Sequence, residues 1–383
     1  MRKRPRIYII INPDARYTRG IYQGVTDYFS QKSQHYDLLV IFDYKFIDRK
    51  IPFEGIIALA STSALEKSLL AYKVPTVNVS SALEFQRLPT VVSNTATSGE
   101  MAAEHLLECK FHNFGFYGCK HAYNSRVMGN SFKHVVESAG FQCSLYFETI
   151  HNYDGAFDRL QQRGLQKWIA SLPKPVGIFS GNDHHAGAVW SACDALELSI
   201  GKEVGIVGHG NDEFFCQTCH PQLSSVESRP DNIGYAAAEL LWRLMQGEKP
   251  PTKPILIPPA GVVRRASSDV LMADDPHVSM AIQFIRDHLD RTLKIQDVFK
   301  HVPLSRRTLQ RRFEKCLGHT LIETVQLLKI ERIKHLLIST HMSMEEIADA
   351  CGFSSASYMT KLFREKISSP PGEYRTRFRD RIP

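Results

Sequence analysis

The 383-residue sequence contains no apolar stretch long enough to cross a membrane. The basic residues at its start precede an apolar run, Ile7 to Ile11, that is shorter than the hydrophobic segment of a secretory signal peptide. We therefore expect a cytoplasmic protein in which this run forms a first buried strand. Gly (23 residues) and Pro (19 residues) are not abundant, and an apolar fraction of 43% excludes a disordered or fibrous chain. The length exceeds that of one ordinary core, so more than one domain is expected.

The eight cysteines show no spacing typical of a disulfide framework, which agrees with a reducing compartment. One stretch, Cys216-Gln217-Thr218-Cys219-His220, matches the c-type haem attachment pattern, and together with His209 it would offer four zinc ligands. Haem attachment requires export, and a zinc site requires that these side chains converge. We interpret the cysteines as ordinary thiols and expect no metal and no cofactor. A metal- or thiol-responsive regulator is the alternative.

The usual catalytic motifs are also absent: the sequence has no G-x-S-x-G nucleophile elbow, no Walker phosphate loop and no H-E-x-x-H zinc helix. Gly208-His209-Gly210 is only a fragment of a dinucleotide-binding loop, and the adjacent histidines of Asp183-His184-His185 are a weak metal signal. We therefore predict that the protein is not an enzyme. An enzyme domain acting on a sugar, fused to a DNA-binding domain, is the alternative, and turnover of a candidate sugar would distinguish it from a sensor.

Acidic and basic residues balance everywhere except in the last quarter of the chain. Residues 1–278 hold 28 of each kind, whereas residues 279–383 hold 19 Lys and Arg against 12 Asp and Glu and so carry the whole net charge of +7. This distribution is expected if only the C-terminal part approaches a polyanion and releases its counterions. A basic tail can also serve solubility alone, so the asymmetry supports DNA binding without deciding it.

A helix-turn-helix pattern lies near the end of the sequence, at residues 347–364. Ile347 and Ala348 close one short helix, and Gly352 supplies a turn position that allows a positive φ. Leu362 and Phe363 anchor a second helix whose polar face points outward. The candidates for DNA contact in this unit are Ser355, Ser357, Thr360 and Lys361.

The same plan occurs earlier in the sequence, where Ile295, Val298 and Phe299 form the apolar stripe of a first helix. Residues 301–304 make the turn, and the next helix packs through Leu309 and Phe313. Its opposite face could reach base edges or phosphates in a major groove; its members are the capping Ser305 and then Arg306, Arg307, Gln310 and Arg311. A helix over 322–338 joins the two units through Ile322, Val325, Leu328, Ile333, Leu336 and Leu337.

These units resemble the DNA-binding domain of the AraC family over residues 279–383. The first matches through Ser305, Leu309, Arg311, Phe313 and Gly318, and the second through Ile347-Ala348, Gly352-Phe353, Ser355, Ser357-Tyr358, Phe363, Pro371 and Tyr374-Arg375. Ser368 stands where the family usually has glycine, at the position of a possible left-handed helix cap. Lys361 stands where arginine is common, and lysine lacks the planar guanidinium with which arginine makes a bidentate contact to guanine. The resemblance implies an all-α double helix-turn-helix domain that binds a double-stranded DNA operator. A helical bundle that binds only protein is the alternative.

Residues 1–263 alternate short apolar strands with amphipathic helices. We expect strands at 7–11, 38–42, 56–59, 76–79, 114–117, 176–179 and 204–207, and helices at 19–29, 99–107, 125–138 and 184–196. This alternation predicts parallel sheets covered by helices on both faces, with ligands at the carboxyl ends of the strands. The length suffices for two such sheets, and the region between two α/β lobes commonly holds a small-molecule site.

This part resembles the sensor domains of the LacI/GalR family, which are similar to periplasmic sugar-binding proteins. The resemblance rests on Arg126-x-x-Gly129 after a strand ending in Tyr117-Gly118, on residues 177–183 with their Asn-Asp pair, and on the strand 204–208. It implies an α/β two-lobed periplasmic-binding-protein-like sensor domain for a sugar-like effector. The candidate ligand-binding residues are Tyr17, Arg19, Asn94, Arg126, Asn182 and Asp183.

Two departures from this family remove acceptors, because Asn94 and Gly210 stand where aspartate is common. The candidates also have structural alternatives: Asp183 can cap the helix that follows it, and Arg19 can pair with a surface carboxylate.

The order of the parts, sensor first and AraC-type domain last, resembles that of the regulators of xylose operons, as does the segment from Tyr17 to Val25. The resemblance implies a transcription activator of carbohydrate-use genes that is gated by a monosaccharide such as xylose. We expect a homodimer, because DNA half-sites are commonly matched by two-fold protein symmetry, and a contact with RNA polymerase if it activates. The predicted domains are a sensor (1–263), a linker (264–278) and a DNA-binding domain (279–383), with Asp275-Pro276 starting the first helix of the last.

Overall fold

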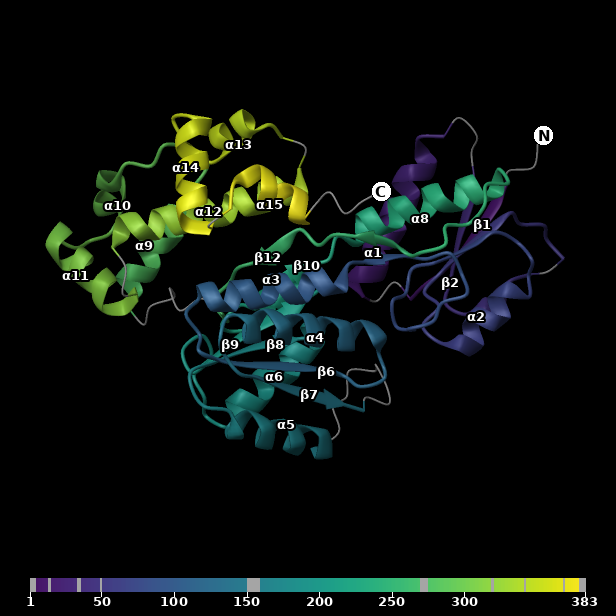
Figure 1. Ribbon diagram of the computed structural model, residues 1–383, viewed down its shortest axis with the longest axis horizontal. Coiled ribbons are helices and arrows are strands. Elements are labelled where there is room, and N and C mark those ends of the chain that lie inside the picture. Colours follow the sequence, from purple (N-terminus) through teal and green to yellow (C-terminus); the bar gives the residue numbers. More distant parts are fainter. Residues whose placement is uncertain are drawn as a thin grey trace.

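The computed structural model describes residues 5–12, 15–32, 36–48, 50–149, 159–268, 275–317, 320–340, 342–367 and 369–378. Within these residues the chain forms two α/β lobes and a helical domain (Figure 1). The first lobe lies at the right of Figure 1, the second lobe below the centre, and the helical domain above the second lobe. This architecture confirms the predicted fold class.

The first lobe is built on a parallel sheet of strand order β2-β1-β3-β4. Its strands are β1 (Arg6–Ile10), β2 (Asp37–Ile41), β3 (Gly55–Ala58) and β4 (Thr76–Asn78), and β5 (Val91–Ser93) pairs with β11 (Ile255–Ile257) beside them. Its helices are α1 (Arg16–Ser30), α2 (Ser63–Leu70) and α8 (Pro230–Met245), with the short η1 (Tyr44–Phe46). Glycines let α1 and α8 approach closely, because a Cβ on Gly24 would lie 1.9 Å from the carbonyl oxygen of Asp231.

The second lobe has a six-stranded sheet of order β12-β10-β9-β8-β6-β7, in which only β12 runs antiparallel to its neighbour. The strands are β6 (Asn113–Cys119), β7 (Cys143–Glu148), β8 (Val176–Ser180), β9 (Val204–His209), β10 (Ser224–Glu227) and β12 (Gly261–Val263). One face is covered by α3 (Thr95–Glu108) and α4 (Tyr123–Ser138), and the other by α5 (Arg159–Ser171) and α6 (Asp183–Ala195). The short α7 (Glu213–Thr218) follows β9.

Three segments cross between the lobes, and they lie side by side. They are Asn94 between β5 and α3, residues 228–229 between β10 and α8, and residues 258–260 between β11 and β12. The backbone N–H of Asn94 donates to the carbonyl of Ile257 at 2.7 Å, and that of Ala260 donates to the carbonyl of Glu227 at 2.9 Å. Any rotation of one lobe against the other must therefore be absorbed in this three-stranded hinge.

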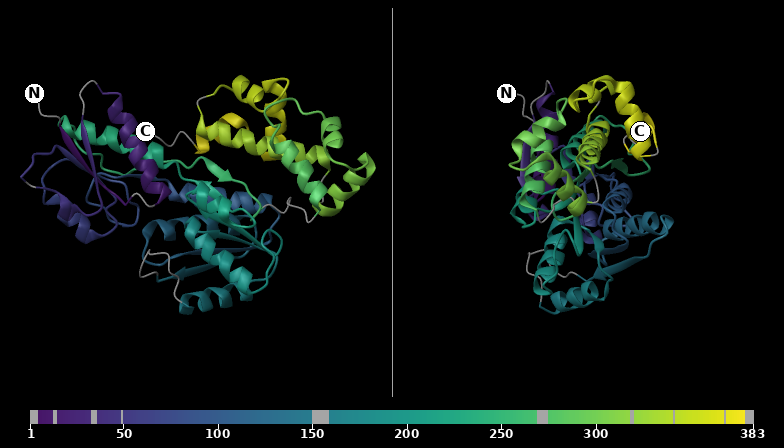
Figure 2. Two further views of the ribbon diagram at one scale, coloured as in Figure 1. Left: turned by 180° about the vertical axis from the view of Figure 1, so that it is seen from behind. Right: turned by 90° about the vertical axis from the view of Figure 1, so that its left-hand side faces the viewer.

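The helical domain consists of two cores joined by one long helix. The helices are α9 (Pro276–Arg286), α10 (Ile295–His301), α11 (Arg306–Leu317), α12 (Leu321–Ser339), α13 (Met344–Ala350), α14 (Ala356–Ile367) and α15 (Pro371–Phe378). Val325 and Leu328 of α12 pack in the first core with α9, α10 and α11, and Ile333 and Leu337 pack in the second with α13, α14 and α15. Both views of Figure 2 place this domain against the second lobe. There, Met101 of α3 joins the second core.

The sequence-based elements compare well with the structure, with definite exceptions. All seven predicted strands are present, whereas β5, β7, β10, β11 and β12 were not predicted. Ile322 was expected in the core of the connecting helix but is 56% exposed, and the preceding Leu321 is buried in its place. Asp275 caps α9 through the N–H groups of His277 and Val278, with Pro276 in the first turn as expected. Gly318, Ser368 and residues 269–274 of the predicted linker lie outside the described residues.

Candidate effector and DNA-binding sites

The first helix-turn-helix unit presents a polar helix face to solvent. Ser305 caps α11, because its Oγ accepts from the N–H of Thr308 at 3.2 Å, and Leu309 and Phe313 are fully buried. The opposite face is exposed and consists of Arg306, Arg307, Gln310 and Arg311. The Arg306 guanidinium lies over the Phe299 ring, 5.4 Å from its centroid.

The second unit repeats this arrangement on α14. Ser355 accepts from the N–H of Tyr358 at 3.2 Å, while Met359, Leu362 and Phe363 are buried. Ser357 and Lys361 are exposed and Thr360 is half-buried, along a shallow hollow between α13 and α14 that Arg364 also lines. Arg364 was not among the predicted contacts, although its helical spacing from Ser357 and Lys361 puts it on the same face.

Gly352 fixes the turn of the second unit by two independent requirements. Its φ is +61°, and a Cβ there would lie 2.0 Å from the carbonyl carbon of Arg291 in the loop before α10. Its carbonyl oxygen accepts from Lys329 Nζ of α12 at 2.8 Å. The predicted positive φ is confirmed, and the same residue also joins the two units.

In the sensor, ion pairs bridge the facing ends of the two lobes. Arg16, at the start of α1, donates from both Nη atoms to the carboxylate of Glu227 at the end of β10, at 2.9 and 2.8 Å, and Nη1 also donates to the carbonyl of Gly210 at 2.7 Å. This is a bidentate, partly buried contact between lobes, and such charge-assisted pairs are among the stronger polar interactions. Arg16 was not a predicted site residue.

Two predicted ligand contacts also lie at this boundary. Arg126 of α4 pairs with Glu84 of the first lobe at 2.8 Å, and Arg19 of α1 lies 4.0 Å from the carboxylate of Asp212 in the second lobe. The first backbone N–H groups of α4, those of Tyr123 and Asn124, donate to carbonyls of Ala82 and Ser81 across the same boundary. Arginines and helix N–H groups are suitable donors to the hydroxyl groups of a sugar.

The remaining predicted ligand residues are engaged within their own lobes. Tyr17 donates its hydroxyl to the carbonyl of Val79 at 2.9 Å, and burial raises its pKa. Asn94 caps α3 by accepting from the N–H of Thr97, and Asn182 caps α6 by accepting from that of His185. The structure therefore places Arg19 and Arg126 at the boundary between the lobes. It places Asn94 and Asn182 at the starts of helices.

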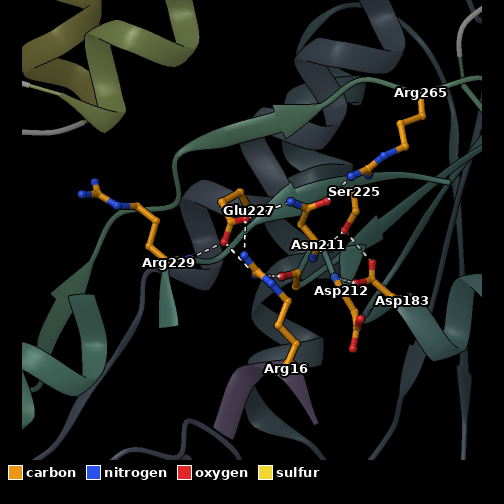
Figure 3. A network of polar contacts seen from close by, with 9 residues as sticks. Arg16, Asp183, Asn211, Asp212, Ser225, Glu227, Arg229 and Arg265 are labelled. Carbon is orange, nitrogen blue, oxygen red and sulfur yellow. Dashed lines mark hydrogen bonds and ion pairs between the residues drawn. The ribbon is translucent and has the colours of Figure 1, made fainter. Parts of the chain in front are cut away.

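Asp183 anchors a polar network behind this boundary (Figure 3). Its carboxylate accepts from Ser225 Oγ at 2.5 Å and from the N–H of Asp212 at 2.7 Å. Burial raises the pKa of Asp183 to about 6, although both hydrogen bonds favour the ionised form. Through Ser225 the network continues to Asn211, whose amide donates to Glu227 at 2.9 Å and accepts from Arg265 at 2.8 Å. Asp183 therefore holds the β9–α7 loop that faces Arg16 and Arg19.

Comparison with known proteins identifies both parts of the chain. A periplasmic binding protein-like domain matches residues 103–268, and a helix-turn-helix domain matches residues 299–377. The xylose operon regulatory protein of Escherichia coli (strain K12) is 30% identical over 386 residues, with 97% of each chain covered. The chain belongs to the family of xylose operon regulatory proteins.

Other members of this family are similar to this chain over nearly its whole length. The Haemophilus influenzae xylose operon regulatory protein is 29% identical over 380 residues, covering 97% of this chain and 98% of its own. A solved structure of the xylose-binding transcription activator xylR is 28% identical, covers 99% of each chain and superposes with a TM-score of 0.63. This family member is thus a DNA-binding transcription regulator, and the predicted resemblance to AraC-type DNA-binding domains and periplasmic-binding-protein-like sensors is confirmed.

The side chains that a haem or zinc site would need, Cys216, Cys219 and His209, have the following surroundings in the structure. Cys216 is fully buried, and burial raises the pKa of both Cys216 and Cys219. The ring nitrogen of His209 lies 3.2 Å from Ser98 Oγ of α3. In the part of the chain that the structure describes, no group of three or more His, Cys, Asp or Glu side chains is arranged to hold a metal ion. No described helix is long and apolar enough to cross a membrane.

Proposed function

We propose that this regulator is a cytoplasmic activator of carbohydrate-use genes whose effector is a pentose of the xylose type. The whole-length similarity to xylose operon regulatory proteins carries the proposal, because it spans the sensor lobes as well as both helix-turn-helix units. The sensor binds the sugar without converting it. The protein acts as a homodimer on an operator with two half-sites and contacts RNA polymerase when it activates.

The effector site in this proposal lies between the lobes. Arg19 and Arg126 exchange their present carboxylate partners for ligand hydroxyl groups, which their guanidinium N–H groups can donate to. Tyr17 and Asp183 shape the site from behind, through their contacts with Val79 and with the β9–α7 loop. Asn94 and Asn182 fix the helix starts that face it.

On the DNA side, α11 and α14 are the recognition helices. In one major groove, the bases are read by Arg307, Gln310 and Arg311. The DNA phosphate backbone beside this groove is contacted by Ser305 and Arg306. In the second major-groove segment, the bases are read by Ser357, Thr360 and Lys361 of α14, with Ser355 at the start of that helix. The sugar changes operator occupancy only through the difference between its affinities for the two arrangements of the lobes.

Thermal unfolding of the purified protein with D-xylose, L-arabinose, D-ribose, D-glucose and D-glucuronate tests the proposal. A ligand at a hundred times its Kd stabilises the folded state by about 2.7 kcal/mol, so a pentose should raise the Tm clearly. Arg126→Ala should abolish the shift. Arg243→Ala, which removes an equally exposed ion pair far from the boundary, should keep it. A shift with no pentose, or one equal in Arg126→Ala and wild type, would contradict the proposed effector site.

A further inference from the structure

The crossover from β10 to α8 holds a residue in an unusual backbone conformation. Arg229 has a φ of 53° and a ψ of 56°, in the left-handed region that non-glycine side chains rarely occupy. It precedes Pro230, the first residue of α8. A conformation of this kind persists only where the surrounding contacts hold it.

Glu227, two residues earlier, joins both lobes to this crossover. Its Oε1 accepts from the backbone N–H of Arg229 at 3.0 Å and from Arg16 Nη1 at 2.9 Å. Its Oε2 accepts from Arg16 Nη2 at 2.8 Å and from Asn211 Nδ2 at 2.9 Å. One partly buried carboxylate therefore holds α1 of the first lobe, the β9–α7 loop of the second lobe and the backbone of Arg229 (Figure 3).

The side chain of Arg229 leads out of this network to the helical domain. Its Nη1 donates to the carbonyl of Ile338, one residue before the end of α12, at 3.3 Å. Its Nη2 lies 2.7 Å from the side-chain amide of Asn232 in the first turn of α8, in the amide orientation that satisfies both polar groups of Asn232. The last carbonyls of a helix have no partner within the helix and attract a cation, so the guanidinium is well suited to this position.

A second, independent contact fixes the same helix to the second lobe. Lys334 of α12 forms an ion pair with Glu108 of α3, and Met101 of α3 packs in the core of the second helix-turn-helix unit. The helix α12 is thus held at two points: at α3 within the second lobe, and at Arg229 on the crossover that leads to the first lobe. When the lobes rotate, these two points must move relative to each other.

We propose that Arg229 is the positioning residue that transmits rotation of the lobes to α12, and through α12 to both recognition helices. Arg16 and Glu227 set the position of Arg229 according to how the lobes meet. Arg229 in turn sets the angle of α12 on α3. The nature of the stimulus, a pentose that changes the lobe arrangement, rests on the proposed function, whereas the positioning contact itself does not.

The test compares Arg229→Asn with Arg375→Gln. Asparagine tolerates the left-handed conformation, so the first variant removes the guanidinium without straining the crossover. Arg375 of α15 donates from Nε to the carbonyl of Leu337, next to Ile338, but lies within the helical domain. Arg375→Gln therefore removes a neighbouring cap of α12 without touching the hinge. Circular dichroism and unfolding of each variant confirm that it folds.

The first readout needs no sugar. Spin labels introduced as unnatural amino acids at the exposed Glu137 of α4 and Glu314 of α11 report the distance between second lobe and helical domain. We expect this distribution to broaden or shift in Arg229→Asn and to match wild type in Arg375→Gln. An unchanged distribution in Arg229→Asn would overturn the proposal, whatever the effector is.

The second readout is the factor by which D-xylose changes affinity for DNA selected by the wild-type protein. In Arg229→Asn this factor should fall to near one, while titration calorimetry gives a D-xylose Kd within threefold of wild type. Arg375→Gln should keep the wild-type factor. If Arg229→Asn also keeps it, the proposal is wrong. If wild type binds no pentose, the proposed function fails and the distance measurement alone decides the role of Arg229.

Discussion

The ion pair between Lys334 and Glu108 predicts how firmly the DNA-binding domain docks on the sensor. The Lys334 side chain is only 11% exposed, and its Nζ also lies 3.3 Å from Glu331 in the preceding turn of α12. Burial and the neighbouring Glu331 raise the pKa of Glu108 to about 7, although Lys334 lowers it. In contrast, Lys334 and Arg264 outweigh the effect of burial on Glu331 and lower its pKa to about 2. One ammonium group therefore holds two carboxylates together.

Replacing Lys334 by methionine keeps the length of the side chain and leaves the acidic side chains of Glu108 and Glu331 without their cation. Removing one partner of a fully buried pair costs about 3–5 kcal/mol. The Glu108 side chain is 35% exposed, so water reduces that penalty, and we expect a loss of about 2 kcal/mol in docking. This corresponds to a roughly thirtyfold shift toward the undocked arrangement.

Hydrogen exchange along α3 and α12 at pH 7 measures this loss. Amides of both helices should exchange faster in Lys334→Met, and adding Glu108→Gln and Glu331→Gln should restore most of the protection, because no unpaired charge is left. Lys133→Met, which removes a more exposed pair with Glu137 on α4, serves as control and should change little. Unchanged exchange at α3 and α12 in Lys334→Met would show that this ion pair does not hold the helical domain on the second lobe.

Gly352, Asp183 and the exposed faces of α11 and α14 give four further predictions. Gly352→Ala should destabilise the helical domain by about 2–4 kcal/mol in denaturant unfolding, because it combines a positive φ with a clash against Arg291. The control Gly372→Ala should be nearly neutral, because a Cβ there meets only open space. Equal effects of the two substitutions would contradict the tight packing described at Gly352. Asp183 has a folded pKa of about 6, above the usual 3.8, so its protonation favours the folded state and this contribution is lost as the pH rises from about 4 through 6. Wild type should therefore lose up to about 3 kcal/mol of stability relative to Asp183→Asn between pH 4 and 7, and a constant difference across that range would show that the carboxyl is not buried as described. Arg307→Ala, Gln310→Ala or Arg311→Ala should each weaken operator binding by about 1–3 kcal/mol where the side chain reads a base, and unchanged affinity with all three replaced would exclude α11 as a reader. Lys361→Ala should reduce the salt dependence of DNA binding by about one unit of slope if Lys361 meets a phosphate, and a changed sequence preference would instead mean a base contact.

The helix-turn-helix units could be predicted from local patterns because each rests on short-range constraints. The positive φ at Gly352, the cap at Ser305 and the helical spacing of Leu309 and Phe313 are local features, whereas the close approach of Gly352 to Arg291 is not. The strands β1 to β4 of the first lobe were equally visible as apolar runs. In contrast, β10 was missed because its Ser224 and Ser225 are fully buried yet polar, their hydroxyl groups being bonded to Arg265 and Asp183.

The candidate effector site was harder to predict because its decisive contacts join distant parts of the chain. Arg16 and Glu227 are 211 positions apart, and no periodicity connects them. Asn94 and Asn182 follow strands, where a helix cap and a ligand contact call for the same residue type. Only the folded structure separates these roles, by showing that each side chain accepts from the third residue after it.

In the proposed function, a sugar bound between the lobes controls DNA binding by the helical domain. The most direct measurement is fluorescence anisotropy of the full-length protein on a duplex that it has itself selected from a random library, with and without saturating D-xylose. We expect a several-fold change in Kd with the sugar, and none in Arg126→Ala. Equal affinities for that duplex, with calorimetry showing that D-xylose is bound, would contradict it.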